Sequence, residues 1–160
     1  MRILALDQAT AISGYAVLED GMCIKSGTID LSKDKNSERR IGRMMTELCN
    51  AIGTSKFDLV IFEDIQKQVN ISTYKSLARI QGAIMLWCYY HDIEFSYILP
   101  TAWRKKLGFH QGGGVKSKEL KQQAISYVKD HCKELDREIG SDEADAICIG
   151  LSYFAGTDNG

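Results

Sequence analysis

The sequence predicts an α/β fold in which helices cover both faces of a mixed five-stranded sheet. The first 31 residues contain three short runs with strand-like alternation, joined by segments too short for a helix. The rest of the chain alternates helical apolar periodicity with two further apolar runs. Because strands joined through a helix usually run parallel, we expect three antiparallel strands followed by parallel ones. A length of 160 residues fits one domain, placed at residues 1–156 with a frayed tail at 157–160.

The three N-terminal strands are predicted from alternating and β-branched residues. The sequences RILALD, SGYAVLE and MCIKSGTIDL place them at residues 2–7, 13–19 and 22–31. The segment DGM between the second and third strands is typical of a hairpin turn. These strands are therefore expected to form an antiparallel meander.

A helix and a central strand follow the meander. The segment SERRIGRMMTELCNAIG predicts a helix over residues 37–53, with Ser37 as its N-cap and Gly53 at its end. Its apolar residues recur at helical spacing: Ile41, Met44, Met45, Leu48 and Ile52. The segment FDLVIFED, at 57–64, is a nearly continuous apolar run of the kind that is buried on both faces in a parallel sheet.

The remaining elements complete the alternation. They are a long helix at 72–92, a strand at 93–100 closed by Pro100, a mixed segment at 101–114, and helices at 116–132 and from Asp142 to about Phe154. An apolar and aromatic stripe in the long helix is expected to lie mainly in the core; its members are Ile80, Ile84, Leu86, Trp87, Tyr89 and Tyr90. Trp103 is expected to pack under the mixed segment.

The composition is that of an ordinary globular protein, with 44% hydrophobic and 26% charged residues. A net charge of −1 excludes a globally basic nucleic-acid binder, so any such surface must be local. Five cysteines without a CxxC pair argue for reduced thiols in the cytoplasm rather than for disulfides or a zinc site. No signal peptide, anchor or membrane-spanning run is evident.

Four acidic residues are predicted to meet at one edge of the sheet. Asp7 and Glu63 end two strands, and doubly wound sheets bind ligands beyond the carboxyl ends of their strands. Asp142 and Asp145 share one helix face in DEADAICIG, where a buried carboxylate is costly unless it is paired, protonated or bound to metal. Two Mg²⁺ ions, with Mn²⁺ as an alternative, would balance the repulsion and support phosphodiester cleavage.

Ordinary structural roles are the alternative for these acids. Asp142 alone would make a helix cap, and Asp7 alone would make a turn residue at the end of a strand. Glu143 lies roughly 100° around the helix from the shared face, so we expect it to face solvent or to support the other acids from behind.

A local basic segment follows the fifth strand. Its basic residues, set against Glu119 alone, are Arg104, Lys105, Lys106, Lys116, Lys118 and Lys121. Such a cluster can neutralise DNA phosphates even in a near-neutral protein, and the glycines at 112–114 would let the backbone approach a duplex closely. The alternative is a solvated helix face beside a flexible loop. The segment lacks the GK[ST] core of a phosphate-binding loop.

The sequence resembles the RuvC-like Holliday junction resolvases of the ribonuclease H-like superfamily, in particular their small phage and prophage branch. The resemblance rests on the ordered motifs ILALDQATAISGYAVL, DLVIFEDIQ, LPTAWRKKLG and DEADAICIG, which span nearly the whole chain. It implies a homodimeric, Mg²⁺-dependent endonuclease that nicks two strands of a four-way junction symmetrically. It also implies that a lysine assists catalysis: Lys118 is the best match, with Lys116 and Lys121 as alternatives. Part of the long helix would then lie in the dimer interface.

The sequence departs from the resolvase pattern at one position. Gln66, flanked by Lys67, stands where bacterial relatives carry an aromatic wedge shortly after the catalytic glutamate. We expect both residues to contact DNA without opening the junction centre by stacking. Loose sequence preference, with cleavage of forks and flaps as well, is the predicted result.

Three other functions are weighed against a resolvase. Sugar-kinase and actin-like ATPases share the fold class, but DQATAISGY lacks their Asp-x-Gly-Thr start and the chain is too short for their two domains. An RNA-processing nuclease of the same superfamily would prefer structured RNA over four-way DNA junctions. A non-catalytic junction-binding protein would bind without cutting, although all four candidate acids are present.

Overall fold

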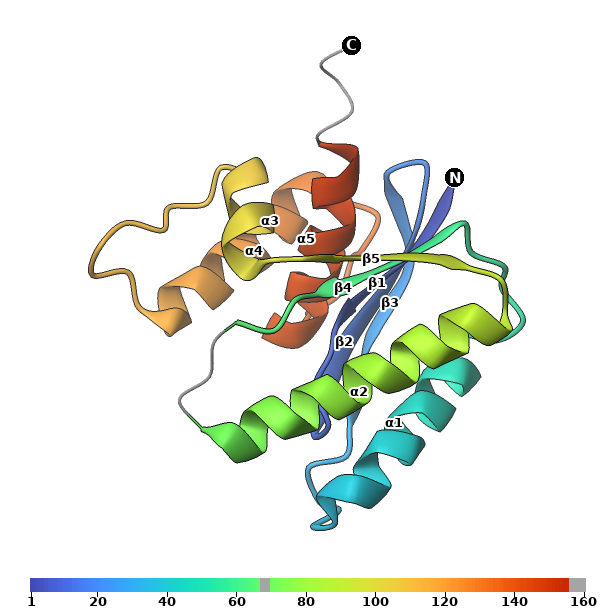
Figure 1. The fold of residues 1–160 in the computed structure, drawn as a ribbon. Coiled ribbons are helices and arrows are strands. Elements are labelled where there is room, and N and C mark those ends of the chain that lie inside the picture. Colours follow the sequence, from blue (N-terminus) through green and yellow to red (C-terminus); the bar gives the residue numbers. More distant parts are fainter. Residues whose placement is uncertain (67–69, 156–160) are drawn as a thin grey trace.

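The computed structural model describes residues 1–66 and 70–155 (Figure 1). In chain order the elements are β1 (Arg2–Asp7), β2 (Ile12–Glu19), β3 (Met22–Asp30), α1 (Ser37–Ile52), β4 (Leu59–Glu63), α2 (Ile71–Tyr90), β5 (Glu94–Ile98), α3 (Pro100–Lys106), α4 (Ser117–His131) and α5 (Ser141–Phe154). The expected tail at 157–160 and Lys67 lie outside the described residues.

The strands form one mixed five-stranded sheet in the order β3-β2-β1-β4-β5. β2 pairs antiparallel with both β1 and β3, whereas β4 pairs parallel with β1 and β5. α1 and α2 cover one face of the sheet, and α3, α4 and α5 gather on the other (Figure 1). The predicted fold class is confirmed.

Alternation along the central strands divides the interior into two cores. On β1, Ile3 and Ala5 pack in the core that includes α4 and α5, whereas Leu4 and Leu6 pack in the core that includes α1 and α2. All four side chains are almost completely buried. Because both faces of β1 and β4 are covered, these strands have nearly continuous apolar sequences.

Helix α5 sits directly on the sheet because small residues allow a close approach. A Cβ atom at Gly150 would come within 2.2 Å of Leu18 Cδ1. At the other end of α5, a Cβ atom at Gly14 on β2 would lie 1.8 Å from the carbonyl oxygen of Asp142. Glycine is therefore required at position 14, where the obstacle is helix backbone, and Gly150 lets α5 lie directly against Leu18 and Ala5.

Two predicted helix boundaries are wrong. The N-cap of α1 is Asn36 rather than Ser37, because the Asn36 side-chain oxygen accepts from the backbone N–H groups of Glu38 and Arg39. Pro100 begins a helix, α3, inside the segment expected to be mixed, since its fixed φ suits the first helical turn.

The prediction for the long helix is only half right. Ile80 and Ile84 of α2 are buried, as expected for a core stripe. Leu86, Tyr89 and Tyr90 are instead exposed, because α2 has one face on the sheet and its other face on the surface.

All five cysteines are free thiols, as predicted: Cys23, Cys88, Cys132 and Cys148 are buried, and Cys49 is half-buried. Among the described helices, none has the length and apolar character that crossing a bilayer takes.

Candidate metal centre and nucleic-acid surface

Asp7 and Glu63 follow neighbouring parallel strands at the carboxyl edge of the sheet. Leu6 and Phe62, the residues just before them, are paired in register. Gln8 extends this pairing: its Nε2 donates to the Glu63 carbonyl oxygen over 2.6 Å, and its Oε1 accepts from the Glu63 N–H over 3.1 Å. Gln81 on α2 donates to the same carbonyl over 2.8 Å. The backbone of Glu63 is therefore held from both β1 and α2.

Helix α5 brings the other two acids to this edge. Asp7 is paired with Gly14 across β1 and β2, and Gly14 lies against the backbone of Asp142. Asp142 is not the helix cap, because Gly140 occupies that position and Asp142 lies in the first turn. Asp145, three residues further on, is only 8% exposed. Its inward position is the feature that a purely structural role does not explain.

The four carboxylates act on one another electrostatically. Burial raises the pKa of Asp7 well above its usual range, and the charges of Glu63, Asp145 and Asp142 raise it further. Burial is also the main reason that the pKa of Asp145 rises to about 7, and Glu63 and Asp142 add to this shift. The pKa of Glu63 is raised by burial as well. Since these acids hinder one another's ionisation, a cation bound among them would be strongly favoured.

The donor set fits a hard divalent cation. Carboxylate oxygens are the ligands that Mg²⁺ and Mn²⁺ prefer, and no imidazole or thiol is needed. Within residues 1–66 and 70–155, no three acidic, histidine or cysteine side chains already converge as a metal-binding group. Some of the carboxylates of Asp7, Glu63, Asp142 and Asp145 would therefore have to turn toward an ion as it binds.

Helix α3 contributes two residues to this site whose roles the sequence did not reveal. Trp103 is fully buried, and its Nε1 donates to Glu63 Oε1 over 2.9 Å. The guanidinium carbon of Arg104 lies 4.8 Å from the centre of the Trp103 ring. The Arg104 charge lowers the pKa of both Glu63 and Asp145, which opposes the effect of burial. Pro100, followed by a tryptophan and basic residues, was the only available signal of this helix.

Among the three candidate lysines, Lys121 acts most clearly on the acids. Its charge lowers the pKa of Asp7 and of Asp145. Neither Lys116 nor Lys118 is among the leading influences on these two acids. Lys116 is the N-cap residue of α4, and all three lysines are exposed. The electrostatics therefore favour Lys121, one helical turn beyond the lysine that the motif match favoured.

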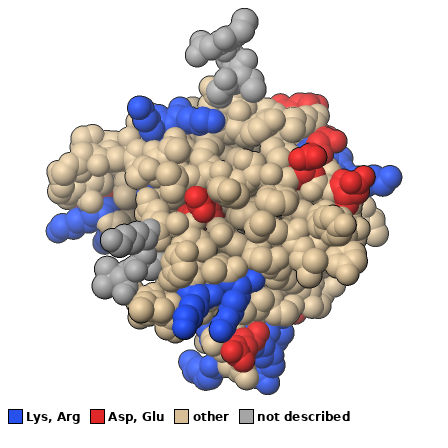
Figure 2. Space-filling view, viewed as in Figure 1, with Lys and Arg blue, Asp and Glu red and all other residues tan. Residues whose placement is uncertain are grey.

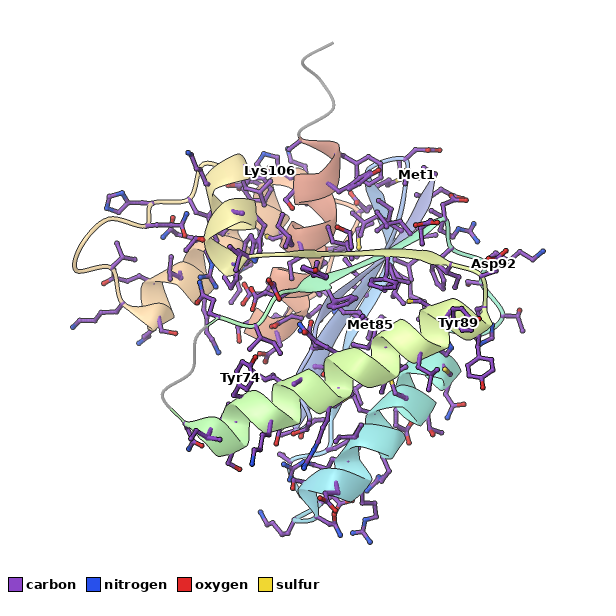
Figure 3. The ribbon with its side chains drawn as sticks, viewed as in Figure 1. Met1, Tyr74, Met85, Tyr89, Asp92 and Lys106 are labelled. Atoms are coloured by element: carbon purple, nitrogen blue, oxygen red, sulfur yellow. The ribbon has the colours of Figure 1, made fainter. Side chains whose placement is uncertain are left out.

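The remaining described residues of the predicted DNA-binding surface are exposed. Lys106 is exposed at the end of α3 (Figure 3). Lys105, the residue before it, and Gln66, after β4, are exposed as well. Basic side chains border the α3–α4 side of the face shown in Figure 2, and an acidic spot is visible near its middle. The glycines at 112–114 are exposed, and Gly114 has a φ of +92°. Arg104 is half-buried over the Trp103 ring, and its charge lowers the pKa of Glu63 and Asp145.

Glu143 does not face solvent. It is 4% exposed, forms an ion pair with Arg137, and accepts a hydrogen bond of 2.7 Å from Ser26 Oγ. Arg137 also donates to the Ser26 carbonyl oxygen. This cluster ties α5 to β3, which supports the site by fixing the helix rather than by supplying a further ligand.

A mixed five-stranded sheet in this strand order is the ribonuclease H-like fold. A family model described as "Crossover junction endodeoxyribonuclease RuvC" matches residues 3–153. The chain therefore belongs to the RuvC family of crossover junction endodeoxyribonucleases, as its motifs predicted, and this is a family of metal-dependent nucleases.

Individual relatives agree with this assignment. A RuvC protein of Campylobacter concisus is 30% identical over 158 residues, and one of Dictyoglomus turgidum is 28% identical over 158 residues; each match covers 96% of both chains. The structure "T. thermophilus RuvC in complex with Holliday junction substrate" has a TM-score of 0.77 at 14% identity, covering 97% of this chain and 94% of that one. A fowlpox virus resolvase, crystallised with "substrate Holliday junction DNA", has a TM-score of 0.61 at 20% identity, covering 99% and 100%.

Proposed function

We propose that this chain is a Mg²⁺-dependent endonuclease that resolves four-way DNA junctions by paired symmetric nicks and also cuts other branched DNA. The observation that carries the proposal is the electrostatic coupling of Asp7, Glu63, Asp142 and Asp145 at one edge of the sheet. The junction substrates named for the T. thermophilus and fowlpox virus structures support the choice of DNA.

The four acids would hold two Mg²⁺ ions, with Mn²⁺ as an alternative. When bound, such a pair activates a water and stabilises the leaving oxygen of the phosphodiester. The chain's own task is to present the carboxylates. Gln8 and Gln81 hold the backbone of Glu63, and the close contact of α5 with β2 holds the two aspartates opposite it.

The basic residues around the acids would bind the DNA backbone. Phosphates on the α3–α4 side would contact the basic segment: Arg104, Lys105, Lys106, Lys116, Lys118 and Lys121. Gln66 and Lys67 would contact DNA after β4. A lysine near the scissile phosphate would assist the reaction; the motif match favours Lys118, and the influence on Asp7 and Asp145 favours Lys121.

The exposed apolar surface of α2 and β5 would form the dimer interface. Leu86, Tyr89 and Tyr90 on α2 are exposed by 56%, 81% and 77%, and Tyr97 on β5 by 57%. Tyr74, Met85 and Tyr89 are spaced along the length of α2 (Figure 3). Large apolar side chains rarely gather on a free surface, and a two-fold dimer would match the two-fold symmetry of a junction.

Free cysteines are typical of a reducing compartment, so we place the enzyme in the cytoplasm.

A cleavage assay tests the proposal directly. The purified chain is incubated with a synthetic four-way junction, with and without Mg²⁺, and the nicks are mapped on all four strands. We expect Mg²⁺-dependent nicks at symmetric positions in two opposed strands, with forks and flaps also cut. Preferential cleavage of structured RNA would instead identify an RNA nuclease. Tight junction binding without any cutting would identify a non-catalytic junction-binding protein.

A further inference from the structure

We propose that Trp103 is a positioning residue for metal binding at Glu63. The indole N–H holds Oε1 of the Glu63 carboxylate and leaves Oε2 as the oxygen available to the ion. This inference rests on the proposed function, because it assigns Glu63 to the metal site.

The fold holds the indole ring in place from several sides. Helix α3 begins at Pro100 and buries Trp103 completely one turn later. Phe109 packs edge-on against the ring with centroids 5.5 Å apart, and the Arg104 guanidinium lies over the ring at 4.8 Å. A fully buried side chain with these contacts has no free rotamer, so the direction of its N–H group is set by packing.

Among the four acids, Glu63 is distinguished by a side-chain hydrogen bond to its carboxylate. Within the described residues, the hydrogen bond of 2.9 Å from Trp103 is the one side-chain hydrogen bond received by any of the four carboxylates. Gln8 and Gln81 hold the Glu63 backbone at the same time. Backbone and carboxylate are therefore both oriented before an ion arrives.

This arrangement has a chemical consequence for metal binding. An indole N–H can only donate, so it occupies a lone pair of Oε1 and opposes rotation of the carboxylate about its last torsion. Residues that orient a metal ligand in this way typically contribute about 10–100-fold to metal affinity or activity. We expect the same range for the loss of the Trp103 donor.

The first test uses the fluorescence of the ring itself. The chain has two tryptophans, so Trp87→Phe leaves Trp103 as the only indole. We expect Mg²⁺ titration of the W87F protein to change the Trp103 emission in a saturable manner. The same titration of the W87F protein carrying Glu63→Gln should leave the emission unchanged. An unresponsive Trp103 in W87F, or a response that persists without the Glu63 carboxylate, would overturn the proposal.

The second test removes the donor and keeps an aromatic ring. Trp103→Phe should raise the Mg²⁺ concentration needed for half-maximal junction cleavage by about 10–100-fold, with junction binding in the absence of metal unchanged. Trp87→Phe is the matched control, because it makes the same substitution at a half-buried position packed against the other hydrophobic core and should leave the midpoint unchanged. Equal midpoints for W103F and the parent would overturn the proposal. Thermal unfolding checks that W103F folds, and the fluorescence test stands if it does not.

The two proposals fail in different ways. If the parent chain cuts no branched DNA but the W87F emission still responds to Mg²⁺ through Glu63, the positioning role stands and the proposed function fails. If the parent cuts junctions but the emission and the Mg²⁺ midpoint are both insensitive, the function stands and the role of Trp103 fails.

Discussion

Substitution of Gly14 by alanine would separate the acids of the sheet from those of α5. The added Cβ would lie 1.8 Å from the Asp142 carbonyl oxygen, and since real Cβ contacts stay beyond 3.0 Å, α5 and β2 must move apart by at least about 1.2 Å. The obstacle is helix backbone rather than a flexible side chain, so the whole N-terminal turn of α5 has to shift. Overpacking of this kind costs about 1–3 kcal/mol of the free energy of unfolding.

The effect on cleavage should exceed the effect on stability. Asp7 is paired with Gly14, so the shift moves Asp142 and Asp145 away from Asp7. Displacement of a reactive arrangement by about 1 Å can cost about 100-fold in rate. We therefore expect single-turnover junction cleavage to fall by at least about 100-fold at saturating Mg²⁺, while Tm falls by roughly 2–12 °C.

The matched control is an alanine substitution elsewhere. Gly42 lies at an exposed position of helix α1, and no atom lies within 4 Å of an added Cβ atom there. Gly42→Ala should stabilise the protein by about 0.5–1 kcal/mol and leave cleavage unchanged. If Gly14→Ala cuts at the parental rate, the contact between β2 and α5 does not position the acids, and the reasoning is refuted.

Four further predictions concern the site and the surface. Asp145→Asn should abolish cleavage but retain measurable junction binding, as followed by gel shift; cleavage at the parental rate would show that Asp145 is not a metal ligand. Lys121→Ala should slow single-turnover cleavage more than it weakens junction binding, and it should slow cleavage more than Lys118→Ala does. A larger loss of rate in Lys118→Ala would instead identify Lys118 as the lysine that assists catalysis. In the metal-free protein, the pKa of Asp145 is raised from 3.8 to about 7, so the folded state binds this proton more tightly than the unfolded chain and stability falls as pH rises through that interval. Mg²⁺ should therefore raise Tm more at pH 8 than at pH 5, and equal increases at both pH values would contradict this coupling. Tyr89→Arg should shift the protein toward the monomer in analytical ultracentrifugation, and an unchanged mass would place the dimer interface elsewhere.

The sequence was sufficient for the fold class, since each strand of the sheet carries its own signal. Short alternating runs predict antiparallel strands, and a continuous apolar run such as that of β4 is typical of a strand covered on both faces. The ends of these apolar runs are also clear in the sequence, so Asp7 and Glu63 could be assigned to one edge of the sheet from the sequence alone. The face shared by Asp142 and Asp145 follows from helical spacing alone.

The partners of these acids were decided by tertiary structure, because the contacts join residues that are far apart in the chain. Trp103 donates to a carboxylate 40 residues away, and Glu143 is satisfied by Ser26, 117 residues away. Helix α3, at seven residues, is too short for a periodic pattern to show. Local sequence determines which element a residue joins and on which face it lies; only packing determines which distant group it meets, and therefore whether a buried charge is paired or left to attract a cation.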